Sequence, residues 1–199
     1  MSSLSDYVLL HMSSNLTDIL QSGYLYSIKK LNEMDDKYEP LNSGNLTPFI
    51  YMTFINKENI ELMKSVNYYL MTGEYFYFVF DPQLLIDKQF YINKSWNFAP
   101  DNDIIKDKTD LLKIIKPYSN YLKNEVLFPK KIQLKKYLKE IHLPIRFINK
   151  QKINIDKLTK LVHDNYGSVS VTVIHPKPAS FLKTEKYFIG NYPIKKLVK

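Results

Sequence analysis

The sequence predicts a mixed α+β domain, because short apolar runs typical of β-strands alternate irregularly with short segments that have helical spacing. The strongest strand signal is residues 75–80, a run of aromatic and branched residues that fits a central strand buried on both sides. Residues 168–174 alternate between polar and branched positions, which predicts another strand. Residues 156–162 have the pattern of an amphipathic helix.

Length and composition limit the class of protein. The chain has 199 residues, of which 45% are hydrophobic, so it can bury a substantial core and is neither disordered nor fibrous. We expect a single domain over residues 1–199, with the motifs in a core over about 7–141 and a strand–helix–strand extension over 142–199. The first residues lack the basic start and long apolar run of a signal peptide, and no stretch reaches the ~18 apolar residues of a membrane span. These features predict a cytoplasmic or host-intracellular protein.

The chain is basic, with 28 Lys and Arg against 20 Asp and Glu and a net charge of +8. This balance favours an anionic partner such as nucleic acid or a phosphorylated ligand, and a lysine-rich solubilising surface is the alternative. Arg146 is the only arginine, so the charge is a diffuse lysine field without the bidentate fork that grips phosphates. Cysteine is absent, which excludes disulfides, thiolate metal sites and a cysteine nucleophile.

The N-terminal segment predicts a strand followed by a short helix. Residues 7–11 form an apolar run that ends on His11. Ser13 or Ser14 can cap a helix, and Gly23 suits the left-handed position after its last turn.

A second unit of strand and helix follows. The polar stretch 29–47 predicts a surface loop, residues 48–54 a strand, and residues 57–71 a helix that Gly73 stops. Beyond the central strand, the sequence predicts a short turn of helix or strand over 84–86, a strand over 90–92 and a loop over 93–108.

The next segment contains a single carboxylate at the start of a strand. Thr109 is a candidate cap for a helix over 110–115. Residues 126–128 then predict a short strand that is entered through Glu125 and closed by Pro129. The lysine-rich stretch 130–141 can begin as a strand extension and become a helix, and residues 145–148 predict a further strand.

Several catalytic classes are excluded because their motifs are missing. The 5 glycines have the spacing of neither a dinucleotide fingerprint nor a Walker loop, and no serine elbow is present. The histidines are scattered, without a pair at the spacing of a helical zinc site. An enzyme with this sequence would therefore depend on a few residues that the fold brings together. The four histidines are His11, His142, His163 and His175.

Three short segments, taken in order, resemble the ADP-ribosyltransferase superfamily. They are LLHMSSNLTDILQSGYL at the start, PFIYMTFINKENI after the first polar loop, and NEVLFPKKIQL late in the chain. They are similar to the His-Tyr-Glu branch of poly(ADP-ribose) polymerases and diphtheria-like toxins, in which a His ends the first strand, a Tyr lies in the second and a Glu opens a late strand. The opening segment also resembles that of the DNA-modifying, DarT-like toxins. The resemblance implies two small packed β-sheets with flanking short helices and an NAD cleft.

The resemblance assigns roles to five residues. His11 would hold a ribose hydroxyl of NAD, and the backbone of Met12, where many relatives have glycine, would pair with the nicotinamide carboxamide. Tyr51 would line the nicotinamide ribose side, and Thr53 would add a hydroxyl to the same wall. Glu125 would be catalytic, with His11 and Tyr51 orienting the NAD.

One carboxylate suffices for this chemistry, because departure of nicotinamide leaves an oxocarbenium-like ribose whose positive charge a nearby carboxylate stabilises. Arginine-modifying relatives carry a second acidic residue two positions before this Glu. Lys123 occupies that position here, which disfavours arginine as the acceptor. Relatives that transfer an RNA 2′-phosphate use several arginines, and this chain has only Arg146.

Each of these residues also has a local interpretation. His11 can cap the following helix, Tyr51 can be one more core tyrosine, and Glu125 can be a solvated residue beside a lysine. Trp96 can line a ligand groove or pack in the core. A cluster of five lysines can be a contact face for an anionic target or a solvated helix face; it comprises Lys130, Lys131, Lys135, Lys136 and Lys139.

The combined hypothesis is mono-ADP-ribosyl transfer from NAD to a macromolecular acceptor, protein or nucleic acid, with release of nicotinamide and without a metal. Hydrolysis of NAD would use the same residues with water as the acceptor. The alternative from another class is a non-enzymatic basic binding module, either a degenerate transferase fold or a nucleic-acid-binding protein.

Overall fold

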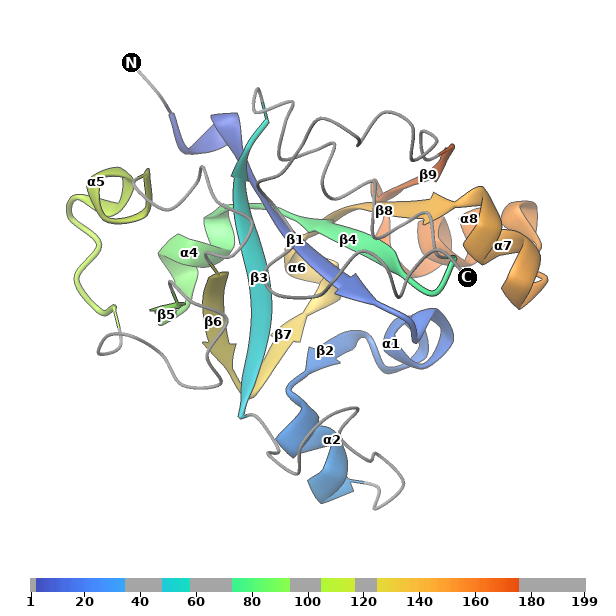
Figure 1. Ribbon diagram of the computed structural model, residues 1–199, viewed down its shortest axis with the longest axis horizontal. Coiled ribbons are helices and arrows are strands. Elements are labelled where there is room, and N and C mark those ends of the chain that lie inside the picture. Colours follow the sequence, from blue (N-terminus) through green and yellow to red (C-terminus); the bar gives the residue numbers. More distant parts are fainter. Residues whose placement is uncertain (1–2, 35–47, 58–72, 94–104, 117–124, 176–199) are drawn as a thin grey trace, which may run out of the picture.

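The computed structural model describes residues 3–34, 48–57, 73–93, 105–116 and 125–175 (Figure 1). Its central strand is β4 (Phe76–Phe80), in which every residue is buried. β1 (Tyr7–Ser13) and β8 (Leu138–Pro144) flank β4, and both pair with it in antiparallel orientation. The predicted central strand is therefore confirmed.

Four further strands complete the same sheet: β3 (Phe49–Asn56), β5 (Tyr91–Asn93), β6 (Glu125–Pro129) and β9 (Ser170–Ile174). The strand order is β5-β6-β3-β1-β4-β8-β9. Neighbours are antiparallel except β8 and β9, which run parallel. A separate antiparallel ribbon consists of β2 (Tyr24–Tyr26) and β7 (Lys131–Gln133). The fold class is α+β, as predicted, and the two expected small sheets are a seven-stranded mixed sheet and a two-stranded ribbon.

Short helices connect these strands. They are α1 (Leu16–Ser22), α2 (Ile28–Met34), α4 (Gln83–Asp87), α5 (Leu111–Ile115), α6 (Leu134–Tyr137), α7 (Ile145–Gln151) and α8 (Ile155–Tyr166). The predicted amphipathic helix over 156–162 corresponds to α8, whose first turn is capped by the side chain of Asn154. No helix among the described residues is long and apolar enough to cross a bilayer.

The start of α1 differs from the prediction by one or two residues. Its N-cap is Asn15, whose side-chain oxygen accepts a hydrogen bond from the N–H of Asp18, and neither Ser13 nor Ser14 has that role. Asn is as good a cap as Ser, so local sequence does not decide between them. The predicted end is confirmed, because Gly23 adopts the left-handed conformation with φ 71°.

The strand predicted over residues 145–148 is wrong, since α7 begins there. Pro144 ends β8 and serves as the N-cap, and the helix buries Phe147 and Ile148 while leaving Arg146 exposed. A run of four residues is too short for its periodicity to separate helix from strand.

The predictions for two other segments are partly wrong. The stretch 130–141 forms β7, a single turn of helix in α6, and then the start of β8. The loop predicted over 29–47 begins as the helix α2, and residues 35–47 lie outside the described part. Also outside lie most of the predicted helix 57–71, most of the loop 93–108, and Trp96.

The remaining local predictions agree with the structure to within a residue or two. Residues 84–86 belong to the helix α4, and the helix predicted over 110–115 is α5. Asp110 takes the N-cap position of α5, while the hydroxyl of Thr109 donates to the carboxylate of Asp107.

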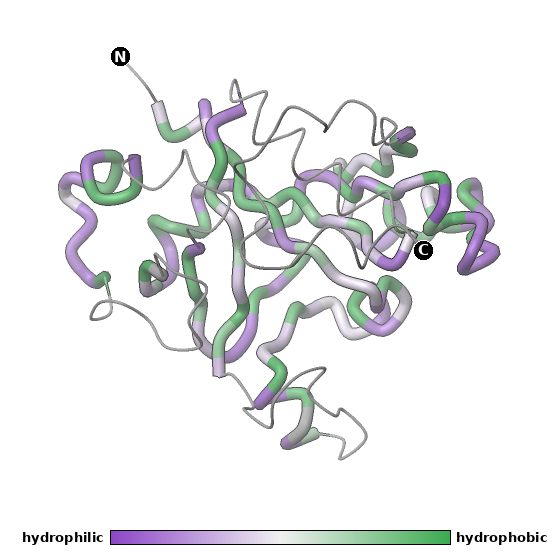
Figure 2. The backbone as a smooth tube through the Cα atoms, in the orientation of Figure 1, coloured by the Kyte–Doolittle hydropathy of each residue, from purple (hydrophilic) through white to green (hydrophobic). Residues whose placement is uncertain are grey.

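The seven-stranded sheet separates two hydrophobic layers. The larger layer includes Leu9 of β1 and reaches Leu25 and Ile132 of the β2–β7 ribbon. The smaller layer includes Leu10 on the opposite face of the same strand, as the alternation of side chains along a strand requires. In Figure 2, hydrophobic residues recur along the central strands, and the outer helices α5, α7 and α8 alternate hydrophobic with hydrophilic residues.

Candidate functional site

Three neighbouring strands carry the residues that the sequence singles out. β1 contains His11 and Met12, β3 contains Tyr51 and Thr53, and β6 begins with Glu125. Because β3 lies between β1 and β6 in the sheet, segments more than a hundred residues apart in the chain lie only two strands apart (Figure 1).

The register of these strands places Thr53 beside Glu125. Leu10 is opposite Thr53 in the β1–β3 pair, and Thr53 is opposite Glu125 in the β3–β6 pair. Residues directly opposite each other share a face of the sheet, so Thr53 and Glu125 point to the same side, and both are partly exposed. With strands about 4.8 Å apart, the backbone of Glu125 lies roughly 10 Å from that of β1.

A hydrogen bond connects His11 with the backbone of Tyr51. The Nδ1 atom of His11 lies 2.8 Å from the carbonyl oxygen of Tyr51. A carbonyl oxygen only accepts hydrogen bonds, so Nδ1 must carry the proton. In the neutral ring, Nε2 is then an acceptor. Among the described residues Nε2 has no partner of its own.

Burial keeps this ring neutral. The partly buried position lowers the pKa of His11 below its usual 6.5, and the hydrogen bond to Tyr51 opposes that effect only in part. At pH 7 the side chain therefore offers a lone pair at Nε2 and carries no positive charge. A hydroxyl is the type of group that such a nitrogen binds as an acceptor.

β1 and β3 separate just beyond this row. Their pairing ends at Leu10 and Thr53, while β1 continues along β4 to Ser13 and β3 continues along β6 to Phe49. Figure 1 shows the two strands diverging towards α1 and the β2–β7 ribbon. His11 bonds to Tyr51 at the start of this divergence, where an inter-strand hydrogen bond would otherwise continue the ladder.

Met12 lies at the same divergence on the other face of β1. It is opposite Tyr77 of β4, and its side chain is 41% exposed. The pleat places Met12, and not His11, on the side of the sheet that carries Thr53 and Glu125. The structure thus brings His11 to Tyr51 and Thr53 to Glu125 as two neighbouring pairs.

A further polar network on this face was not anticipated from the sequence. The hydroxyl of Tyr77 lies 2.7 Å from Nδ1 of His142, and Nε2 of His142 lies 2.6 Å from the carboxylate of Glu140. Burial, together with the charge of Glu140, raises the pKa of Tyr77 well above 10. The one sequence signal was the spacing of Glu140 and His142, two residues apart on a strand and hence on one face.

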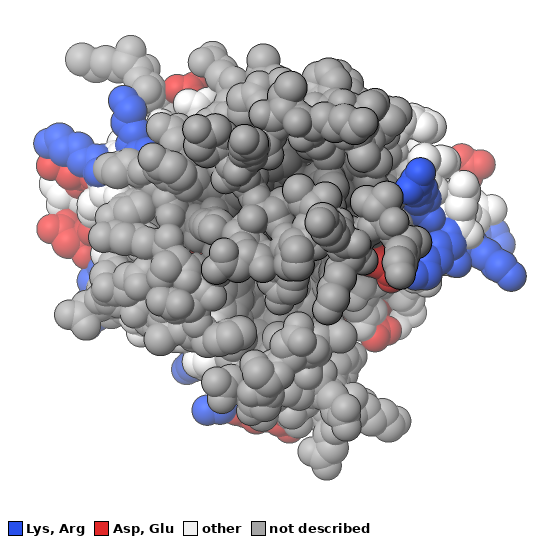
Figure 3. Space-filling model, viewed as in Figure 1, with Lys and Arg blue, Asp and Glu red and all other residues white. Residues whose placement is uncertain are grey.

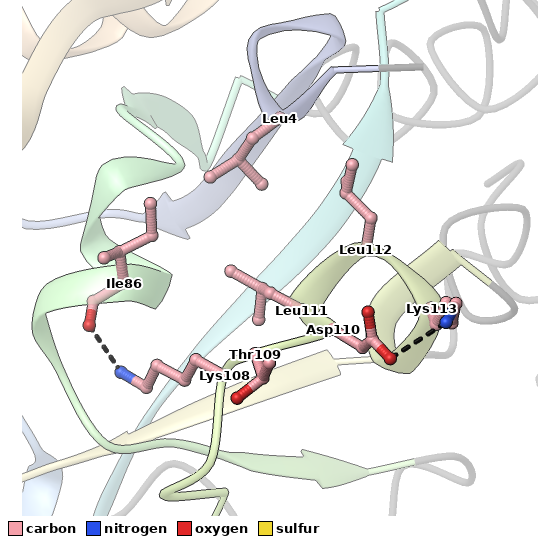
Figure 4. Close-up of a pocket in the computed structure, with 8 residues that line it drawn as sticks. All are labelled: Leu4, Ile86, Lys108, Thr109, Asp110, Leu111, Leu112 and Lys113. Carbon is pink, nitrogen blue, oxygen red and sulfur yellow. Dashed lines mark hydrogen bonds and ion pairs between the residues drawn. The ribbon is translucent and has the colours of Figure 1, made fainter. Parts of the chain in front are cut away.

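Two hollows lined by described residues lie elsewhere. The first, of about 460 Å³, is lined by Leu4, Ile86 and residues 108–113, and Lys108 donates a hydrogen bond to the carbonyl of Ile86 (Figure 4). The second, of about 430 Å³, lies at the N-terminal end of β1. Neither is lined by His11, Tyr51 or Glu125. The described residues contain no cluster of His, Asp and Glu that could hold a metal ion.

The lysine cluster of residues 130–139 is only partly available for an anionic partner. Lys136 pairs with Asp87 at 2.6 Å, and Lys139 pairs with Asp81 at 3.0 Å. In Figure 3 the described Lys and Arg side chains lie at the rim of the face in view, next to carboxylates. The net charge therefore does not collect in one uniform patch on the described part of that face.

Neither a protein-family model nor a curated protein matches the sequence. Solved structures do match it. DarT from Thermus sp. 2.9 in complex with ADP-ribosylated ssDNA has a TM-score of 0.51 at 11% identity, over 85% of this chain and 95% of that chain. The same protein in complex with carba-NAD+ has a TM-score of 0.51 at 12% identity, over 83% of this chain and 94% of that one. Its complex with NAD+ has a TM-score of 0.50 at 12% identity, over 82% and 94%.

Over most of its length the chain therefore has the α+β fold of the DarT ADP-ribosyltransferases. At such low identity the likeness is one of fold. The predicted resemblance to the superfamily is confirmed at that level.

Proposed function

We propose that this chain, which has the fold of an NAD-using ADP-ribosyltransferase, transfers ADP-ribose from NAD to a macromolecular acceptor with release of nicotinamide. The observation that carries the proposal is the hydrogen bond from His11 to the Tyr51 carbonyl at the point where β1 and β3 separate. The bond presents an imidazole acceptor beside β3, the strand that pairs with β6 and places Thr53 opposite Glu125. The pairing of β9 with β8 supports treating residues 1–199 as one domain, because the C-terminal extension contributes a strand to the same sheet.

His11, Met12, Tyr51 and Thr53 would form the NAD-binding surface. The neutral His11 would accept a hydrogen bond from a ribose hydroxyl at Nε2. Beyond Leu10 the strand β1 no longer pairs with β3, which leaves that edge near Met12 as the place where a carboxamide would bind to backbone. Tyr51 and Thr53, alternate residues of β3, would line the ribose from one face of the sheet.

Glu125 would be the catalytic residue. It would accept a hydrogen bond from the ribose hydroxyl next to the reacting carbon and stabilise the positive charge that develops as nicotinamide leaves. It lies beside Thr53 on the face of the sheet opposite to His11, so the ribose would contact both residues at the point where β1 and β3 separate. The reaction needs no metal.

Nucleic acid is the acceptor that we favour over protein. One of the structures with this fold is DarT from Thermus sp. 2.9 bound to ADP-ribosylated ssDNA. The present chain carries a net charge of +8, which would attract a polyanion without specifying its sequence. Lys123 at the position of a second acidic residue argues against arginine as the acceptor.

The test is a comparison of Glu125→Gln with Glu33→Gln in an assay with labelled NAD. Glu33 pairs with Lys30 on the exposed surface of α2, so its substitution removes the same charge away from the proposed site. We expect Glu125→Gln to lower nicotinamide release by on the order of 10²–10³ and Glu33→Gln to leave it unchanged. Equal turnover in the Glu125 variant and the wild type would refute the assignment, provided that both have the same thermal unfolding midpoint.

The alternative is a non-enzymatic module that binds nucleic acid. It is favoured by the lysines near β7 that have no carboxylate beside them among the described residues, such as Lys131. A wild-type protein that neither releases nicotinamide nor gains thermal stability with NAD, yet binds an oligonucleotide in a salt-dependent manner, would favour this alternative. Label appearing only in free ADP-ribose would instead indicate hydrolysis.

A further inference from the structure

We infer that the outer face of the β2–β7 ribbon is a binding surface for single-stranded nucleic acid, with tyrosine rings for the bases and lysines for the phosphates. The inference rests on the proposed function in that it gives the acceptor strand a place on the protein outside the reacting centre.

The ribbon has one buried and one open face. Leu25 and Ile132 are opposite each other and are 3% and 1% exposed, so they anchor the ribbon on the hydrophobic core. Tyr24 is opposite Gln133, and Tyr26 is opposite Lys131. These four residues therefore share the outer face, where the two tyrosines are partly exposed and Lys131 and Gln133 are exposed.

The two tyrosine rings form an aromatic platform. Their centroids are 5.8 Å apart, with 38° between the ring planes. Within the described part of the chain neither hydroxyl has a hydrogen-bond partner, so the rings are not held in place as part of a polar network. Aromatic rings exposed on a strand are the usual stacking partners of unpaired bases, because every base has a π-face.

The positive charge next to this platform is uncompensated. The Nζ atom of Lys131 lies 4.7 Å from the ring centroid of Tyr24, and no carboxylate among the described residues pairs with it. Exposed Lys130, in the turn before β7 with φ 68°, likewise has no described acidic partner. By contrast, Lys136 and Lys139 are neutralised by carboxylates. A polyanion complements Lys130 and Lys131, since no carboxylate among the described residues neutralises their charge.

The ribbon is also fixed close to the proposed reacting centre. The N–H of Ser27 donates to the carbonyl of Lys130 at 2.9 Å, and the N–H of Lys130 donates to the carbonyl of Pro48 at 3.4 Å. These bonds hold the ribbon at the end of β3 and β6 where Phe49 is opposite Pro129. Four residues of extended strand separate Pro129 from Glu125, which is roughly 14 Å. A short single strand stacked on the ribbon would span that distance.

A single strand fits these features better than a duplex or a protein. Stacking requires unpaired bases, and lysine contacts read phosphates without regard to sequence. The ribbon has no arginine for base edges, as Arg146 lies on α7.

Fluorescence anisotropy with a labelled oligothymidine tests the inference, using the full chain. Tyr26→Ala should weaken binding by about 5- to 150-fold, the range for one lost stacking contact, whereas Tyr26→Phe keeps the ring and should bind as the wild type does. The double variant Lys130→Gln/Lys131→Gln should lower the salt slope by roughly 1–2. The matched control Lys113→Gln removes an exposed lysine that pairs with Asp110 on α5 and should have no effect.

The outcomes separate this inference from the proposed function. Glu125→Gln should bind the oligothymidine normally, and the ribbon variants should release nicotinamide from NAD at the wild-type rate in the absence of nucleic acid. The inference would be overturned, even if the enzyme is active, if Tyr26→Ala and Lys130→Gln/Lys131→Gln both bound the oligothymidine with wild-type affinity. Equal affinity of the wild type for a duplex of the same length would also overturn it. Circular dichroism of each variant shows whether it is folded, so that weakened binding caused by misfolding is recognised.

Discussion

The Nδ1 atom of His11 donates a hydrogen bond to the carbonyl oxygen of Tyr51, 2.8 Å away and forty residues further along the chain. This bond determines the tautomer of the imidazole and leaves Nε2 as an acceptor. The bond lies at the point at which β1 and β3 stop pairing, and it orients the nitrogen that the proposed site uses.

This relationship predicts an acid limb in the pH profile of kcat/KM for NAD. Because the folded-state pKa of His11 lies below 6.5, protonation at acid pH would turn Nε2 from an acceptor into a donor and weaken the contact to the ribose hydroxyl. We expect His11→Gln, which does not titrate, to lose that limb and to lower kcat/KM at pH 7 by about 5- to 10-fold, the worth of one hydrogen bond. If the acid limb is unchanged in His11→Gln, another titrating group causes it and the prediction is wrong.

The same shift has a consequence for stability. A folded-state pKa below the unfolded one means that the unfolded chain binds more protons between the two values, so the free energy of unfolding falls as the pH drops through 6.5. Urea denaturation of the wild type and His11→Gln between pH 7.5 and 5 should show the steeper loss in the wild type.

Asp87 should stabilise the fold at neutral pH through contacts with Lys136, Gln83 and Tyr137. The hydrogen bond from Lys136, followed by those from Gln83 and Tyr137, lowers the pKa of Asp87 to about 2. A lowered carboxylate pKa contributes stability above its unfolded value of 3.8, and that contribution is lost as the pH falls towards about 2. Asp87→Asn should therefore be less stable than the wild type at pH 7 and nearly as stable at pH 2.5. A constant difference across this range would contradict the assignment.

Gly73 should tolerate no side chain. It has φ 72°, and a Cβ there would lie 2.9 Å from Cβ of Arg146 and 3.3 Å from the backbone carbon of that residue. Gly23 has φ 71° but nothing nearer than the Tyr166 hydroxyl at 4.0 Å, so Gly23→Ala reports the backbone strain alone, about 1 kcal/mol. We expect Gly73→Ala to lower the free energy of unfolding by about 1–3 kcal/mol more than Gly23→Ala does. Equal losses would show that α7 moves aside without cost.

The Tyr77–His142–Glu140 network should make the fold sensitive to alkali. The raised pKa of Tyr77 means that its protonated form is favoured in the folded state, so its contribution is present below pH 10 and is lost as the pH rises above 10. Tyr77→Phe removes the hydrogen bond to His142 and should cost about 1–2 kcal/mol at pH 7. The difference between the two proteins should shrink at pH 10.5. If it grows instead, the hydroxyl does not donate to His142 as described.

Much of the candidate site could be predicted because its strands carry strong local signals. The apolar runs that end on His11, contain Tyr51 and follow Glu125 all form strands where expected. Long, strongly patterned strands such as β4 are the most predictable, since aromatic and branched side chains on both faces leave few alternatives. The helix α7 shows the limit, because a run of four residues after a proline, three of them apolar, fits either type of element.

By itself the sequence determined that the segments ending on His11, containing Tyr51 and following Glu125 become strands, and that a carboxylate stands at the start of β6. It also determined that no cysteine, glycine-rich loop or zinc-helix motif supplies the chemistry, because these properties follow from residue type and local periodicity. Only the tertiary structure decided that β3 lies between β1 and β6, that Thr53 is opposite Glu125, and that His11 bonds to the backbone of Tyr51. The physical reason is that strand order and register arise from packing both faces of the whole sheet, and a shift of one residue would move each side chain to the other face.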